Sequence, residues 1–196
     1  IHADMLFAAR KAGLAFILNV TLNADKTVRA AFAGDPEKAH AEGCRQLARE
    51  VTVRRVEADI VITGNGGYPL DQNIYQAVKG MTAAEACCRP GGVIIMAAGC
   101  SDGAGGENFY RALAEAESPE RLLARIRAVP RHATPQDQWE YQILARILAK
   151  FRVILVTDLC DAKLVESMHM RHAASLSEAL GMAEAMCGSD AGFVVI

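Results

Sequence analysis

The sequence lacks the features that mark several large classes of protein. No run approaches 18 consecutive apolar residues, so we expect no transmembrane helix and no membrane partner. No cluster of lysine and arginine offers a phosphate-binding surface, and the formal net charge is −2, so nucleic acid is not expected as a partner. No charged segment precedes an apolar stretch as in a signal peptide, and we expect a cytoplasmic protein.

Several chemical motifs are also missing. The six cysteines form no C-x-x-C pair, and no histidine stands at zinc-finger spacing from them. Cys87 and Cys88 are adjacent, which is poor geometry for a mutual disulfide, so we expect reduced and mostly buried thiols. The absence of a G-x-G-x-x-G fingerprint disfavours an NAD-type dehydrogenase, and no G-x-S-x-G nucleophile elbow is present.

The composition is that of an ordinary globular α/β protein. The chain has 196 residues, of which 52% are hydrophobic and 22% are charged, so it can bury a sizeable core without a disulfide or metal. This length predicts a single domain over residues 1–196. The chain starts at Ile1 without a methionine and is helical in pattern at once, which leads us to expect a part of a longer protein.

The first fifty residues predict a helix, a β-hairpin and a second helix. Residues 2–12 have helical periodicity and end at a glycine. Apolar segments at 16–22 and 28–34 flank a turn-forming sequence, which is typical of a hairpin. Asp35 is a good N-cap and Pro36 stands at the first helical position, so a helix is expected to run from there to about Glu50.

The remainder alternates between strands and helices. The alternation of apolar and basic residues over 51–56 predicts an edge strand. Further strands are expected at 58–63, 93–98, 152–157 and 193–196, and helices at 71–88 (capped by Asp71), 107–116, 119–127, 136–150 and 176–187 (opened by Ser175). This order predicts a doubly wound α/β fold, with a mostly parallel sheet flanked by helices and a β-hairpin appendage near the N-terminus.

The strongest candidate site lies after the 58–63 strand. Ligands of such sheets bind beyond the carboxyl ends of the strands, where a glycine-rich loop runs into the next helix. Gln76 and Lys79 are three residues apart on one helix face with Tyr75 beside them, which suits a carboxylate. Equally, Tyr75 could simply pack and Lys79 could be an ordinary solvated residue.

Three other signals are weaker. The loop over 99–106 is either a phosphate cradle or a tight turn between a strand and a helix. His169 and His172 have a spacing that could bind a metal, but no third ligand is near, so we predict no metal site. Trp139 could belong to the core or to the wall of a cleft.

The residues also resemble a known family. The segments Phe16-Ile17-Leu18-Asn19-Val20, Ala31-Phe32-Ala33-Gly34-Asp35, Gly66-Gly67-Tyr68-Pro69 and Asn73-Ile74-Tyr75-Gln76-Ala77-Val78-Lys79 are similar to the carboxy-terminal domain of the nickel-dependent lactate racemase family. The likeness runs in order from about His2 to the end, and residues 1–15 resemble the crossover helix between two domains. It implies the carboxy-terminal half of a two-domain racemase or epimerase of small 2-hydroxy acids.

The resemblance also implies a cofactor and a division of labour. The cofactor is nickel pyridinium-3,5-bisthiocarboxylic acid mononucleotide, bound mainly by the missing amino-terminal domain, with reversible hydride transfer at the substrate C2. The catalytic residues belong to that domain, so we expect the isolated chain to be inactive. Tyr75, Gln76, Lys79 and Trp139 are expected to contact substrate or cofactor. The alternative is a non-catalytic α/β domain that binds a ligand or regulates.

Overall fold

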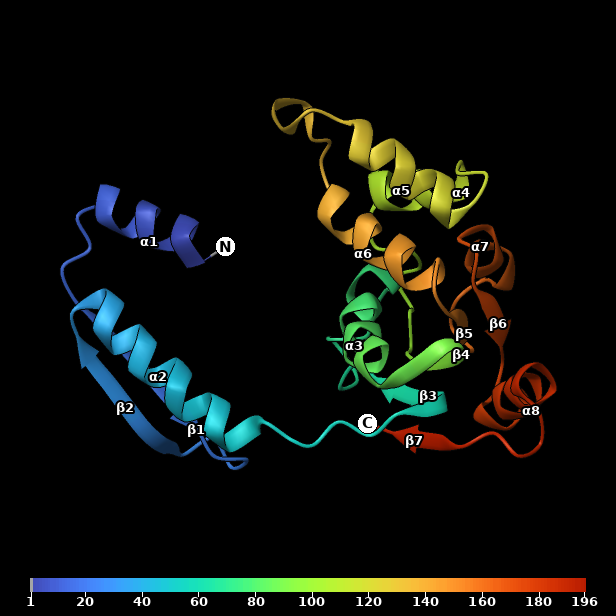
Figure 1. Cartoon of the computed structure of the whole chain (residues 1–196), viewed down its shortest axis with the longest axis horizontal. Coiled ribbons are helices and arrows are strands. Elements are labelled where there is room, and N and C mark those ends of the chain that lie inside the picture. The colour runs from blue at the N-terminus through green and yellow to red at the C-terminus, as the bar shows by residue number, and fades with distance from the viewer. Residues whose placement is uncertain (1) are drawn as a thin grey trace. The chain divides into compact units, whose positions relative to one another are not determined.

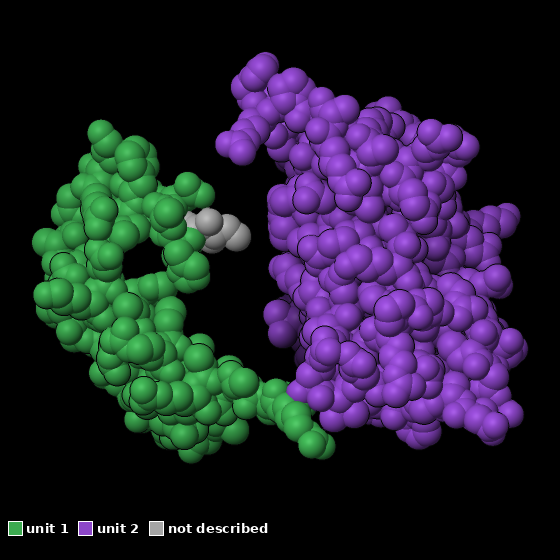
Figure 2. Space-filling view, viewed as in Figure 1, with its two compact units in different colours: residues 1–54 green, residues 55–196 purple. Residues whose placement is uncertain are grey.

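The computed structural model describes residues 2–196 of the chain. It divides the chain into two compact units, residues 1–54 and residues 55–196 (Figure 2). Each unit has its own internal packing.

The first unit is a β-hairpin with two helices. Its elements are α1 (His2–Lys11), β1 (Ile17–Leu22), β2 (Val28–Gly34) and α2 (Pro36–Val51). The strands pair antiparallel, which confirms the predicted hairpin, with one irregularity in the register between Thr21 and Leu22. Asp35 caps α2 as predicted, because its side chain accepts a hydrogen bond from the Lys38 backbone N–H at 3.0 Å.

The hairpin has one covered and one uncovered face. Phe32 is buried on the side that carries α2, where Gly43 lets the helix come within van der Waals distance of its ring. The opposite side carries large apolar side chains that are 46 to 65% exposed: Phe16, Leu18, Val20 and Leu22. Such a face normally packs against another layer of structure.

The second unit is a parallel sheet covered by helices. Its elements are β3 (Ala58–Gly64), α3 (Ile74–Cys87), β4 (Cys88–Ala97), α4 (Glu107–Ala114), α5 (Pro119–Ala128), a 3₁₀ turn (Arg131–Ala133), α6 (Gln138–Leu148), β5 (Arg152–Val156), α7 (Ala162–Ser167), β6 (Arg171–Ala173), α8 (Leu176–Cys187) and β7 (Phe193–Val195). The strand order is β6-β5-β4-β3-β7, and every neighbouring pair is parallel (Figure 1). The predicted fold class is confirmed.

Helices cover both faces of this sheet, which explains its unbroken apolar strands. In β4, Ile94 and Met96 point into the larger core beneath α3 to α7, whereas Val93 and Ile95 point into the smaller core beneath α8. All four side chains are fully buried. Ser175 caps α8 as predicted, since it accepts from the Glu178 N–H at 3.2 Å.

Two expectations about the elements are wrong, and two short elements were missed. The alternating segment 51–56 is not a strand: Val51 ends α2, no strand pairs with the residues that follow, and Val53 is 83% exposed. The strand expected from Val93 begins at Cys88, with a register shift opposite Ala58 and Ile60 that accommodates the Pro-Gly-Gly sequence. The short elements α7 and β6 were not predicted.

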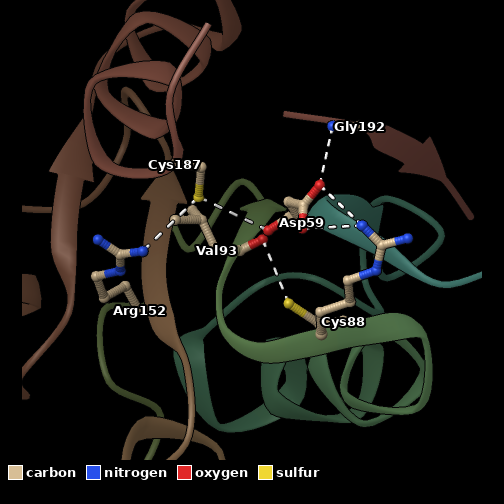
Figure 3. Close-up of polar contacts among 7 residues, drawn as sticks. Asp59, Cys88, Val93, Arg152, Cys187 and Gly192 are labelled. Atoms are coloured by element: carbon tan, nitrogen blue, oxygen red, sulfur yellow. Dashed lines mark hydrogen bonds and ion pairs between the residues drawn. The ribbon is translucent and has the colours of Figure 1, made fainter. Parts of the chain in front are cut away.

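The amino end of β3 is tied to its neighbours by Asp59 (Figure 3). Its carboxylate accepts hydrogen bonds from the Arg89 guanidinium at 3.1 Å and from the Gly192 N–H at 3.0 Å. These two donors, the guanidinium first, lower the pKa of Asp59. The Cys187 thiol lies 3.8 Å from the Asp59 carbonyl oxygen and accepts from Arg152 at 3.7 Å. The cluster joins β3, β4, β5, the residue that precedes β7 and the end of α8.

All six cysteines are free thiols, but only Cys88 and Cys100 are buried, so the expectation of mostly buried thiols is wrong. Burial raises the pKa of both to about 12, so these two thiols stay protonated.

Among the described residues, no helix is at once long enough and apolar enough to cross a membrane.

Candidate functional site

Two glycine-rich loops meet at the carboxyl ends of β3 and β4. The loop after β4 runs along the segment that leads into α3, and the two are joined by four backbone hydrogen bonds of 2.8 to 3.0 Å. The donors are the N–H groups of Cys100, Asp102, Ile74 and Tyr75, and the acceptors are the carbonyls of Asp71, Gln72, Gly103 and Ala104. The second loop is therefore a support for the first turn of α3.

The cap of α3 is Asn73 and not the predicted Asp71. The Asn73 side chain accepts from the Gln76 N–H at 3.0 Å, and its amide donates to Asp102 at 3.2 Å. Asp71 instead accepts from the Gly99 N–H at 2.9 Å. Both residue types are good caps, so the sequence alone did not distinguish a cap from a bond between loops.

Close approaches of the backbone fix this turn further. Gly105 has φ +85°, and a Cβ atom there would lie 2.3 Å from the Asn73 side chain. A Cβ at Gly80 would lie 2.4 Å from the carbonyl oxygen of Gly64 at the end of β3. The side-chain amide of Asn65 donates to the backbone carbonyl of Gln76 at 2.9 Å. The first two turns of α3 are thus held against the sheet edge by contacts that tolerate little displacement.

Lys79 and Gln76 lie together on α3, as their spacing predicts. The Lys79 ammonium donates to the Gln76 Oε1 atom at 2.5 Å. Lys79 is exposed and Gln76 is half-buried. No carboxylate of the described chain forms an ion pair with this lysine. Since Gln76 uses its carbonyl oxygen for Lys79, its NH₂ group can donate to a ligand.

Tyr75 connects this pair to an aromatic wall. Its ring packs edge-on against Trp139, with centroids 5.8 Å apart, and against Phe109, with centroids 5.2 Å apart. Phe109 is fully buried, whereas Trp139 is 53% exposed. Trp139 therefore lies at the surface beside Tyr75 and not in the core, and Tyr75 both packs and borders the candidate site.

A buried carboxyl group behind Trp139 was missed in the sequence. Glu140 is 0% exposed, and neither of its carboxyl oxygens has a hydrogen-bond partner among the described residues. Burial raises the pKa of Glu140 to about 7, and the positive charge of Lys79 opposes this rise. Glu140 lies on the same apolar helix face as Leu144 and Ile147. This position is the only feature of the sequence that could have indicated its burial.

Carboxyl groups also surround the phenol. Burial raises the pKa of Tyr75, and the charges of Asp137 and Glu140 raise it further, while a hydrogen bond from Trp139 opposes them. Asp137 precedes α6 with φ +62°, a left-handed conformation that is costly for a residue with a side chain. Tyr75 therefore stays protonated and can donate its O–H.

The two histidines at metal-like spacing serve the backbone instead. The His169 Nε2 atom lies 3.1 Å from the Leu113 carbonyl oxygen, and the His172 Nε2 atom lies 2.9 Å from the Thr157 carbonyl oxygen. Among residues 2–196, no group of three or more histidine, cysteine or acidic side chains is arranged to hold a metal ion. The candidate site of this chain thus consists of an ammonium, an amide, a phenol, an indole and a buried carboxyl group.

The family model described as the lactate racemase C-terminal domain matches residues 53–196. The chain belongs to this family. The start of the match coincides with the boundary between the two units, so the second unit is the family domain.

Relatives extend the likeness to the whole chain. Curated proteins named lactate racemase from Thermoanaerobacterium thermosaccharolyticum and Lactiplantibacillus plantarum are 53% and 52% identical over all 196 residues. The solved lactate racemase apoprotein from T. thermosaccharolyticum superposes with a TM-score of 0.95, covering 100% of this chain and 47% of that structure. The chain spans about half the length of these lactate racemases, and it corresponds to their C-terminal part.

Proposed function

We propose that this chain is the carboxy-terminal, substrate- and cofactor-contacting part of a racemase or epimerase of lactate or another small 2-hydroxy acid. The pairing of Lys79 with Gln76 at the carboxyl edge of the sheet, beside Tyr75 and Trp139, is the observation that carries the proposal. A 2-hydroxy carboxylate presents a negative charge and a hydroxyl group, and this set of side chains offers a cation and hydrogen-bond donors to match them.

The binding step follows from these groups. The Lys79 ammonium binds the substrate carboxylate, and a charge-assisted hydrogen bond of this kind contributes about 1.5–3 kcal/mol. The Gln76 NH₂ group donates a second, directional bond that orients the substrate. The rings of Tyr75 and Trp139 keep water from one side of the bound acid, which strengthens both polar contacts.

The residues of this chain suit the polar groups of a nickel pincer cofactor but offer nothing for its metal. The ammonium of Lys79 and the amide of Gln76 can bind carboxylate or phosphate oxygens. The metal ligands and the groups that move the hydroxyl proton would come from the amino-terminal half, because the described residues hold no suitable cluster. When bound, the cofactor supplies a hydride acceptor for the substrate C2.

The partner of this chain is then the amino-terminal half of the same polypeptide. The exposed side of the hairpin, with Phe16, Leu18, Val20 and Leu22, is the kind of surface that such a half would cover. The relatives are about twice as long, which leaves ample chain for that half. Residues 1–15 serve in this proposal as the crossover between the halves.

The test uses the full-length parent protein, produced with nickel and the enzymes that build the cofactor. Loss of optical activity is followed for a panel of 2-hydroxy acids that starts with lactate and malate. Racemisation of one acid is the expected result and identifies the substrate. A protein that binds a panel acid without racemising any of them would contradict the proposal and favour a ligand-binding or regulatory domain.

A further inference from the structure

Glu140 is the one carboxyl group of the candidate site that is both fully buried and without a hydrogen-bond partner in the described chain. It occupies the first turn of α6, directly after Trp139, where α6 packs against α3. A buried carboxyl group without partners costs several kcal/mol when it is ionised. Buried ionisable groups of this kind are concentrated at functional sites, where their ionisation takes part in binding or catalysis.

The charged groups near Glu140 single out Lys79. On α3, the ammonium of Lys79 acts on the Glu140 carboxyl, and Glu140 in turn acts on the phenol of Tyr75. On α4 and α5, Arg111 pairs with Glu115, Arg121 pairs with Glu117, and Arg125 donates to the Ala112 carbonyl.

On α6 itself, Asp137 acts on the phenols of Tyr75 and Tyr141, and the cation Arg146 pairs with Glu85. Lys79 is therefore the cation whose charge acts on the Glu140 carboxyl group and lowers its pKa. It is also the cation that the proposed substrate carboxylate requires.

We propose that Glu140 is a positioning residue that couples substrate binding to its own protonation by competing with the substrate carboxylate for Lys79. This inference rests on the proposed function, because it assumes that Lys79 binds a carboxylate. When Glu140 is ionised, it attracts the ammonium of Lys79 and repels the incoming anion. When Glu140 is protonated, the only contact that the described residues offer the Lys79 ammonium is the neutral side-chain carbonyl of Gln76, so the ammonium is free to bind the substrate.

The direction of the pH dependence follows from this competition. Burial raises the pKa of Glu140 to about 7, so the carboxyl group ionises as the pH rises through neutrality. Substrate affinity must then fall as the pH rises through 7, and the bound substrate must in turn raise the pKa of Glu140, since the coupling is reciprocal. The chemical step itself does not involve Glu140.

The first test compares wild-type, Glu140→Gln and Glu85→Gln forms of the full-length, cofactor-loaded protein between pH 5.5 and 8.5. For the wild type, we expect KM to rise roughly fivefold across this range while kcat is little affected by the coupling. Glu140→Gln keeps the shape but removes the charge, so its KM stays near the low wild-type value at every pH. Glu85 lies in the same interface of α3 and α6, paired with Arg146 and Lys150, and its variant keeps the wild-type profile.

The second test does not depend on turnover. Trp139 is the only tryptophan of the 196-residue chain, so its fluorescence reports on the neighbouring carboxyl group. We expect the emission of this chain to titrate near pH 7, and the Glu140→Gln variant to lose that transition while Glu85→Gln retains it.

The two proposals fail in different ways. A KM profile shared by the wild type and Glu140→Gln, or a fluorescence transition that survives this substitution, would overturn the role of Glu140. Absence of racemisation by the wild-type protein would instead count against the proposed function.

Discussion

Single residues decide the geometry of the candidate site. The spacing of Gln76 and Lys79 was enough to predict that they share a helix face, because a helix places residues three apart side by side. The sequence did not predict the role of Glu140. A carboxyl group next to an apolar helix face is expected to be exposed to solvent, whereas Glu140 is fully buried. Burial depends on the packing of α3 against α6, which local pattern does not contain.

Gly105 offers a test of the close approach at this site. We expect Gly105→Ala to lower the free energy of unfolding by about 3 kcal/mol, because an alanine meets both a left-handed backbone and the Asn73 side chain. Gly67→Ala is the matched control: its φ is +75°, but no atom lies within 4 Å of the added Cβ, so it should cost only about 1 kcal/mol. Urea unfolding measures both. Equal losses would mean that the close approach contributes nothing.

At the scale of elements, long periodic segments were predictable and short or unpaired ones were not. The hairpin, the apolar strands and helices such as α8 were predicted because period and capping agree. The segment 51–56 alternates like a strand but finds no partner strand, and α7 and β6 are too short to show a period. Strand pairing is a tertiary property, so alternation alone cannot establish it.

Asp59 joins several strands at once, and its contribution should depend on pH. Hydrogen bonds from Arg89 and Gly192 lower its pKa below the ordinary value of 3.8. The stabilisation from a lowered carboxyl pKa is present above the ordinary value and is lost as the pH falls through the lowered one. We expect Asp59→Asn to lower the Tm at pH 7 and the difference from the wild type to shrink below about pH 4.

The control for this prediction is Asp158→Asn, which replaces an exposed aspartate outside the cluster. Its Tm should follow the wild type at every pH. A deficit for Asp59→Asn that is as large at pH 3 as at pH 7 would mean that the negative charge of Asp59 is not what stabilises the sheet.

At the scale of the whole molecule, the second unit has the core of an independent domain. It buries apolar side chains on both faces of its sheet, and the family match covers it from residue 53. We therefore expect residues 55–196 to unfold in one cooperative transition with about 5–15 kcal/mol of stability, measured by circular dichroism in urea. A non-cooperative transition would show that the second unit needs residues 1–54 to fold.

The first unit, in contrast, lacks a core of this kind in the described residues. Its helix α1 buries no side chain, and one side of its hairpin is apolar and exposed. The sequence predicted these elements, with the hairpin as an appendage, but it did not predict that they pack together as a unit of their own, because each one has ordinary periodicity. In our proposal this unit completes its packing against the amino-terminal half, and the isolated chain is inactive.

The most direct test of the account is the effect of Lys79→Ala on the full-length, cofactor-loaded protein. We predict that kcat/KM for the substrate identified in the panel falls at least tenfold, which is about 1.4 kcal/mol of transition-state stabilisation, and that Gln76→Ala has a loss of the same order. Lys150→Ala removes a lysine that pairs with Glu85 and should keep the wild-type value within about twofold. If Lys79→Ala retains wild-type kcat/KM, the site does not bind substrate as proposed.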